Sequence, residues 1–179
     1  ELRLLRSIDP PTARAFAVSG KVRLDTTLPD EVVDAELGVG GAGGATFTSS
    51  GRLQGDVRSR ASAAFDDDDE TWWQSGLQRA EGSWFGWTWP TASTATVTSL
   101  RVVADDRHSI PTSVHLEVDG VAGPRLDLDG VPDRPANPGG VLTLRLAEPQ
   151  TVTGTSVRIV IDTARTTTAN GWYTQRPQI

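Results

Sequence analysis

The sequence contains no cysteine, so no disulfide stabilises the fold, and this absence alone does not assign an oxidising or a reducing compartment. Lysine is almost absent, because Lys21 is the only lysine among 17 basic residues. No apolar run approaches the roughly 20 residues of a membrane-spanning helix, and no signal-peptide pattern is present. The formal net charge of −6 disfavours a protein that binds the phosphate backbone of nucleic acids, since such proteins are normally basic.

Helical periodicity is also scarce. Residues 30–37 are the one segment expected to form a short helix, with Asp30 as its N-cap. Residues 38–44 hold five glycines, which predicts a mobile loop or a short linker. Residues 1–14 are expected to be an N-terminal extension from a larger chain, and residues 15–179 a single domain that contains the glycine-rich loop.

Short stretches with period-two alternation dominate the rest of the chain. Phe85, Trp87 and Trp89 share one face of such a stretch and are expected to point into the core. Short strands with little helix between them predict an all-β fold, an antiparallel β-sandwich or jelly roll of about eight main strands. The expected strands are residues 15–24, 46–50, 83–89, 100–104, 113–118, 126–128, 141–146 and 156–161.

The acidic run from Asp66 to Glu70 has three interpretations: a solvated turn, a calcium site, or catalytic carboxylates. Carboxylate, hydroxyl and main-chain oxygens suit calcium, so the predicted ligands are Asp66, Asp68, Thr71 and carbonyls near Phe65. The spacing is not that of an EF-hand. Adjacent carboxylates also differ from the facing pair that a glycosidase needs. Neither a nucleophile elbow nor a phosphate loop nor a zinc spacing appears in the sequence, which predicts a fragment without catalytic residues.

Trp172 and Tyr173 lie in a polar stretch where no core periodicity requires an aromatic residue. An exposed aromatic ring in a loop can pack against the C–H face of a sugar. We therefore predict a carbohydrate-binding site in which Trp172 and Tyr173 stack on sugar rings and Arg107 and His108 hydrogen-bond to hydroxyl groups. The alternative is that this loop folds back on the sheet and the tryptophan is structural.

The acidic segment resembles the loop of the discoidin family, the coagulation factor 5/8 C-terminal type. The residues that match the family pattern Ala-x-Asp-Gly-Asp-x-x-Thr-x-Trp are Ala64, Asp66, Asp68, Thr71 and Trp73. Asp67 stands where the family has glycine, and Asp69 where it often has proline. The glycine position is expected to need a left-handed turn, which Asp tolerates better than most residues. The resemblance implies a galactose-binding-domain-like sandwich.

Residues 49–56, 60–63, 100–105 and 107–112 are similar to a subgroup of these modules, found in the membrane arabinofuranosyltransferases that build actinobacterial and mycobacterial cell-wall arabinan. This resemblance implies a non-catalytic module on the extracytoplasmic side of a membrane-anchored glycosyltransferase. Its partners would be arabinan or arabinogalactan and the rest of the parent protein. Three functions are left open: a carbohydrate-binding module, a structural or docking domain of the parent that binds no glycan, and an independent enzyme.

Overall fold

The computed structural model describes residues 12, 15, 17, 24–77, 80–104, 108–132 and 140–166. Most of the predicted N-terminal extension and most of the expected strand 15–24 lie outside these residues. The main elements are α1 (Asp30–Leu37), β1 (Thr46–Ser49), β2 (Trp84–Ala104), β3 (Ile110–Val118), β4 (Val121–Asp127) and β5 (Gly140–Arg165). Short 3-10 turns cover Ala42–Gly44, Val57–Ser59 and Ala61–Ala64. Within the described ranges, no helix has both the length and the apolar character needed to cross a bilayer.

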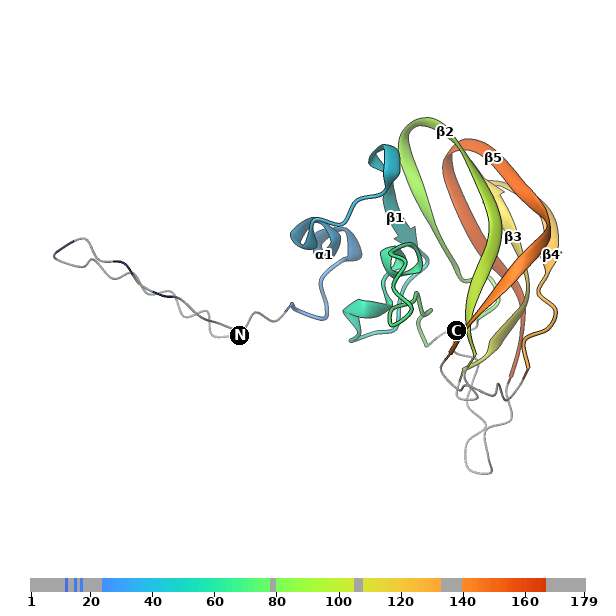
Figure 1. Ribbon diagram of the computed structural model, residues 1–179, viewed down its shortest axis with the longest axis horizontal. Coiled ribbons are helices and arrows are strands. Elements are labelled where there is room, and N and C mark those ends of the chain that lie inside the picture. The colour runs from blue at the N-terminus through green and yellow to red at the C-terminus, as the bar shows by residue number, and fades with distance from the viewer. Residues whose placement is uncertain are drawn as a thin grey trace, which may run out of the picture.

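The strands form one five-stranded sheet in the order β1-β2-β5-β3-β4, and all neighbouring strands are antiparallel. β2 and β5 form a long central ribbon, in which Trp84 pairs with Val160 at one end and Ala104 with Gly140 at the other. Figure 1 shows this ribbon rising, turning over at the top and descending again. The turn-over lies at two register shifts, where irregular pairing lets the strands bend without separating.

The folded ribbon produces two facing layers. The first layer holds β1, the first part of β2, the last part of β5, β3 and β4, and the second holds the remaining halves of β2 and β5. Leu100 and Leu144 of the second layer pack against the core cluster that contains Trp87 and Val157 of the first. The predicted antiparallel β-sandwich is therefore confirmed.

The expected number of strands was too high for the described part of the chain. Residues 83–89 and 100–104, predicted as separate strands, fall almost entirely within β2, and residues 141–146 and 156–161 belong to β5. The threonine-rich segment after Pro90, which was not expected to be a strand, pairs with β5 through the bend. Strand pairing over this distance overrides the local turn signal.

The core lies between the layers and on the inner face of the first. Trp87 is 8% exposed, and Phe85 and Trp89 pack against the same cluster from neighbouring positions of β2. The predicted inward orientation of these three aromatic residues is confirmed. Complete burial of an apolar side chain stabilises a fold by about 1.5–3 kcal/mol, so this row contributes substantially to folding. Buried aliphatic residues complete the cluster: Val114, Leu116, Leu128, Val157, Ile159 and Ile161.

The helix α1 has the bounds that the sequence predicts, but Asp30 is not its cap. The N-cap position is Pro29, without a side-chain capping bond, and Asp30 is the first helical residue. The Asp30 carboxylate instead accepts a 2.5 Å hydrogen bond from Arg52 Nε. Asp34 in the same helix accepts bonds from Arg60 Nε at 2.6 Å and from Ser62 Oγ at 2.7 Å. These largely buried ion pairs fix the helix beside the segment that leads into the acidic loop.

The glycine-rich segment is partly regular, which corrects the prediction of a simple loop. Gly38 adopts the left-handed conformation that ends α1, with φ of 67°. Residues Ala42–Gly44 form a 3-10 turn, and Trp89 Nε1 donates a hydrogen bond to Ala42 O at 3.3 Å. The segment therefore packs on β2 as part of the same domain.

Candidate functional site

The acidic loop is closed by hydrogen bonds between its own residues. Asp66 Oδ1 accepts a bond from Asp68 N at 3.1 Å, and Asp66 Oδ2 accepts one from Thr71 Oγ1 at 2.8 Å. Asp68 Oδ1 accepts a bond from Glu70 N at 2.9 Å. Aspartate side chains commonly form such turns with backbone N–H groups two residues later. The carboxylates of the predicted metal site thus hold the loop in shape.

The two positions that depart from the family pattern share one partner, Arg101 of β2. Asp67 has a φ of 58°, so the predicted left-handed turn at the family's glycine position is confirmed. Arg101 donates to Asp67 Oδ1 and, from Nη1, to Asp69 Oδ1 at 2.9 Å. The hydrogen bonds that Arg101 donates to Asp69 and then to Asp67 raise the pKa of its guanidinium. One cation therefore joins the loop to the second layer of the sandwich.

The predicted calcium ligands fit only an incomplete shell. Both oxygens of Asp66 and one of Asp68 already accept hydrogen bonds. Among the described residues, no group of three or more His, Cys, Asp or Glu side chains converges on a point where a metal could sit. Calcium takes six to eight oxygens, so an ion here would rely on Asp68 Oδ2, main-chain carbonyls such as that of Phe65, and water. Calcium binding stays a prediction.

A cavity of about 430 Å³ lies beneath the acidic loop, between the two layers. The first layer contributes Phe85 and Trp87 to its lining, and the second contributes Leu100 and Val102. The exposed side chains of the acidic loop, from Asp66 to Asp69, lie at its solvent end. Volumes of this size are typical of sites for small ligands.

Aromatic side chains form the wall of the cavity on the first layer. Phe65 packs edge-on against Trp87, with ring centroids 5.2 Å apart, and Trp73 lies 4.8 Å from Phe85. Phe65 precedes the acidic run, so its ring anchors the loop to this wall. Gln74, 5% exposed, adds a carboxamide that can both donate and accept hydrogen bonds. The cavity combines ring faces with a few polar groups, as sugar-binding sites do.

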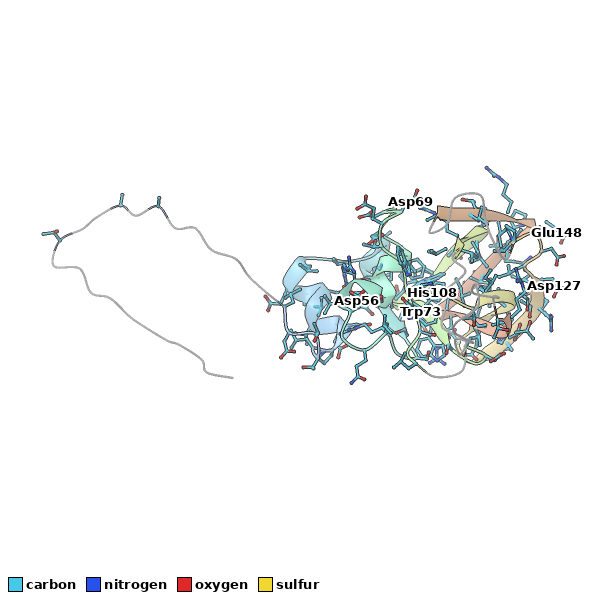
Figure 2. All side chains as sticks on the ribbon, turned by 90° about the horizontal axis from the view of Figure 1, so that it is seen from below. Asp56, Asp69, Trp73, His108, Asp127 and Glu148 are labelled. Atoms are coloured by element: carbon cyan, nitrogen blue, oxygen red, sulfur yellow. The ribbon has the colours of Figure 1, made fainter. Side chains whose placement is uncertain are left out.

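His108 is the one predicted carbohydrate-binding residue that the structure describes. It lines the cavity together with Trp73, and both are labelled in Figure 2. Arg107, Trp172 and Tyr173 lie outside the described residues, so their roles stay predictions. Arg165, near the end of the described chain, pairs with Ile110, two residues after His108. The last described residues therefore lie at the same end of the sandwich as His108.

Sequence reasoning did not assign Arg101, Gln74 or the cavity to a site. Arg101 stands in an alternating strand pattern, and its link to Asp69 spans 32 residues, so no local motif indicates it. The available signal was that Asp67 and Asp69 depart from the discoidin loop pattern. Two such carboxylates close together are stabilised by a nearby cation, which here is Arg101. Trp72, which the sequence analysis did not assign, also lines the cavity and is half-buried.

No protein-family model and no curated protein sequence matches the chain. Solved structures do. A family 32 carbohydrate-binding module of NanJ from C. perfringens, in complex with galactose, matches 66% of this chain and 82% of that chain at 12% identity, with a TM-score of 0.42. A chitosan-binding module of a chitosanase/glucanase from Paenibacillus sp. IK-5 matches 68% of this chain and 85% of that one at 21% identity, with a TM-score of 0.37.

The arabinofuranosyltransferase AftD from Mycobacteria is also similar, at 20% identity over 67% of this chain, with a TM-score of 0.45. The match covers only 9% of that much longer protein. At these TM-scores, no residue role is carried from them to this chain.

Proposed function

We propose that this chain is a non-catalytic carbohydrate-binding module. The observation that carries the proposal is the cavity of about 430 Å³ in which aromatic rings, Gln74 and His108 meet beneath the acidic loop. Sugar rings present apolar C–H faces that pack on aromatic side chains, and hydroxyl groups that pair with carboxamide, imidazole and carboxylate groups. The glycan would bind at this end of the sandwich.

The proposed ligand is an arabinose-containing cell-wall glycan, arabinan or arabinogalactan. The support is the similarity of residues 49–56, 60–63, 100–105 and 107–112 to modules of membrane arabinofuranosyltransferases. The parent would then be such an enzyme, with this module on the extracytoplasmic side of the membrane. The catalytic residues would lie elsewhere in the parent.

Four side chains are proposed to contact the glycan. Trp172 and Tyr173 would supply stacking faces, and Arg107 and His108 hydrogen bonds to ring hydroxyls. A site at the open end of a sandwich buries little ligand area, so affinity should be modest, roughly millimolar to micromolar.

The test is a calorimetric titration of arabinan oligosaccharides into the wild-type chain, Trp172→Ala and His108→Ala. Galactose and chitotriose serve as comparison ligands, because two of the matched modules were solved in complex with these sugars. We expect arabinan fragments to bind the wild type and to bind both variants at least tenfold more weakly. Equal binding by all three proteins would remove these residues from the site.

The alternative is a docking domain that packs against the parent and binds no glycan. The observation that favours it is exposed apolar surface on the described chain, since Leu37 of α1 is 52% exposed and Leu77 is 63% exposed. If no arabinan fragment, galactose or chitotriose binds, the docking interpretation replaces the carbohydrate-binding one. Leu37→Glu and Leu77→Glu should then weaken association with the separately produced remainder of the parent.

A further inference from the structure

Two largely buried polar side chains of the cavity have unused hydrogen-bonding capacity. Gln74 is 5% exposed and Ser109 is 6% exposed, and both residues line the cavity. Neither the Gln74 carboxamide nor the Ser109 hydroxyl has a hydrogen-bond partner among the described residues. The unpaired side-chain atoms that are completely enclosed belong to Trp87 and Asp162 instead. The polar atoms of Gln74 and Ser109 therefore keep some accessible surface, and the cavity is the space from which a ligand can reach them.

These two groups set what a ligand in the cavity must carry. Buried donors and acceptors without partners are unfavourable, and native structures rarely leave them so. A carboxamide both donates and accepts hydrogen bonds, and so does a hydroxyl. A hydrocarbon ligand would leave both groups unpaired. A ligand with several hydroxyl groups can pair with both.

The rest of the lining supports a ligand that is partly polar and partly apolar. Ser99 of β2 and His108, beside Ser109, add two more polar side chains to the cavity. Between these groups lie apolar walls, formed by Phe85 of the first layer and Leu100 of the second. Sugar rings combine hydroxyl groups with apolar C–H faces that pack on aromatic side chains. A single sugar residue is therefore the class of ligand that matches both parts of the lining.

The charges at the solvent end favour a neutral sugar over an anionic one. Four consecutive aspartates, Asp66–Asp69, line this end of the cavity. The nearby cation, Arg101, is already bound to two of them, Asp67 and Asp69. A carboxylate entering here would meet repulsion from the remaining acids.

We propose that Gln74 and Ser109 are the specificity-determining residues of an inner subsite that holds one neutral sugar residue between the two layers. The Gln74 carboxamide would donate a hydrogen bond to one hydroxyl group of the sugar and accept one from another. The Ser109 hydroxyl would pair with a further hydroxyl group. This inference rests on the proposed carbohydrate-binding function. A subsite built to pair with hydroxyl groups discriminates strongly against analogues that lack them.

The experiment titrates methyl arabinofuranoside and its 2-, 3- and 5-deoxy analogues into ¹⁵N-labelled protein. The side-chain NH₂ signals of Gln74 report on the carboxamide directly, and the spectrum of Gln74→Leu identifies them by their absence. We expect the parent glycoside to shift these signals, and at least one deoxy analogue to bind the wild type about tenfold more weakly.

The variant Gln74→Leu separates hydrogen bonding from a structural effect. It should bind the parent glycoside about tenfold more weakly than the wild type does. It should bind the sensitive deoxy analogue as weakly as the wild type does, because that hydrogen bond is already missing. A purely structural effect of the substitution would weaken the binding of all the ligands by the same factor. Ser109→Ala applies the same test to the second group and does not depend on the folding of Gln74→Leu.

Matched controls and one charged ligand complete the test. Gln54→Leu and Ser93→Ala remove the same side-chain groups outside the cavity lining and should bind every ligand as the wild type does. The analogue with a carboxylate at C5 should bind at least tenfold more weakly than the parent glycoside, and equal binding would overturn the preference for a neutral sugar.

The outcomes distinguish this inference from the proposed function. If the glycoside binds without shifting the Gln74 signals, or if both variants weaken all the ligands equally, the inner subsite is refuted and the carbohydrate-binding function stands. If neither the glycoside nor the arabinan fragments bind the wild type, the proposed function fails and the inner subsite fails with it.

Discussion

Arg101 Nη1 donates a 2.9 Å hydrogen bond to Asp69 Oδ1, and this bond ties the acidic loop to the half of β2 that lies in the second layer. A second bond from the same guanidinium reaches Asp67. Both acids are exposed, so the clamp orders the loop rather than dominating global stability. Its position at the solvent end of the cavity means that loop order and access to the cavity depend on the same residue.

The first prediction concerns this clamp. Arg101→Gln should speed hydrogen exchange at the amides of Asp68 and Glu70, because the turns that protect them lose their anchor. The melting temperature should change little. Hydrogen–deuterium exchange with mass spectrometry measures the effect. Arg125→Gln, which removes the exposed pair with Asp127, is the control and should leave the loop unaffected. Unchanged exchange in Arg101→Gln would show that the aspartate turns suffice.

The second prediction concerns calcium. An incomplete shell implies a dissociation constant near 1 mM, as in weak extracellular calcium modules. At about 10 mM calcium, binding to the native state alone would add about 1.4 kcal/mol, or roughly 3–6 °C in melting temperature. Differential scanning fluorimetry with calcium and with a chelator measures this shift. Asp68→Ala should abolish it, while Asp127→Ala should retain it. A wild type that melts at one temperature in both conditions has no calcium site in this loop.

The third prediction concerns the aromatic wall. Trp87→Ala should lower the free energy of unfolding by about 3–5 kcal/mol, because it removes a large buried ring from the core. Urea denaturation followed by circular dichroism measures the difference. The comparison is Val121→Ala, at a position 71% exposed, which should stay close to wild type. A Trp87→Ala protein as stable as the wild type would contradict the inward orientation of this row.

Features that depend on short-range pattern were predictable from the sequence. The bounds of α1 and the inward row of Phe85, Trp87 and Trp89 follow from spacing within one element. The left-handed turn at Asp67 follows from the position that the family fills with glycine. The first two features need only the spacing within one element, and the third needs only the family pattern at one position.

Features that depend on distant partners were not predictable. Asp30 is a residue type that often caps helices, yet its carboxylate accepts a hydrogen bond from Arg52, 22 residues away. The segment after Pro90 has the signals of a turn, yet pairing with β5 keeps it in a strand. The cavity arises only when the β2–β5 ribbon folds over, which brings Phe85 and Leu100 of one strand to opposite walls. None of these partners lies within the window of a sequence pattern.

The last prediction concerns pH and the turn between β3 and β4. Asp119 adopts a φ of 48° and accepts hydrogen bonds from Thr155 Oγ1 at 2.8 Å and Ser156 N at 2.8 Å. These bonds, that of the Thr155 hydroxyl first, hold the pKa of Asp119 below its ordinary value, which is about 3.9 in an unfolded chain. A carboxyl group whose pKa is lower in the folded state contributes stability that is fully present above the unfolded pKa. That contribution is lost as the pH falls through the folded pKa.

Asp119→Asn keeps an acceptor oxygen and tolerates the left-handed turn, but it removes the charge. The variant should therefore be less stable than the wild type at pH 7, and the difference should shrink as the pH falls below about 4. Urea unfolding at pH 7 and pH 3 measures both differences. Val121→Ala, in the same hairpin, changes no titratable group and is the control that should show no such pH dependence. A difference for Asp119→Asn that is equal at both pH values would mean that the carboxylate charge contributes nothing, and that the acceptor oxygen alone holds the β3–β4 turn against β5.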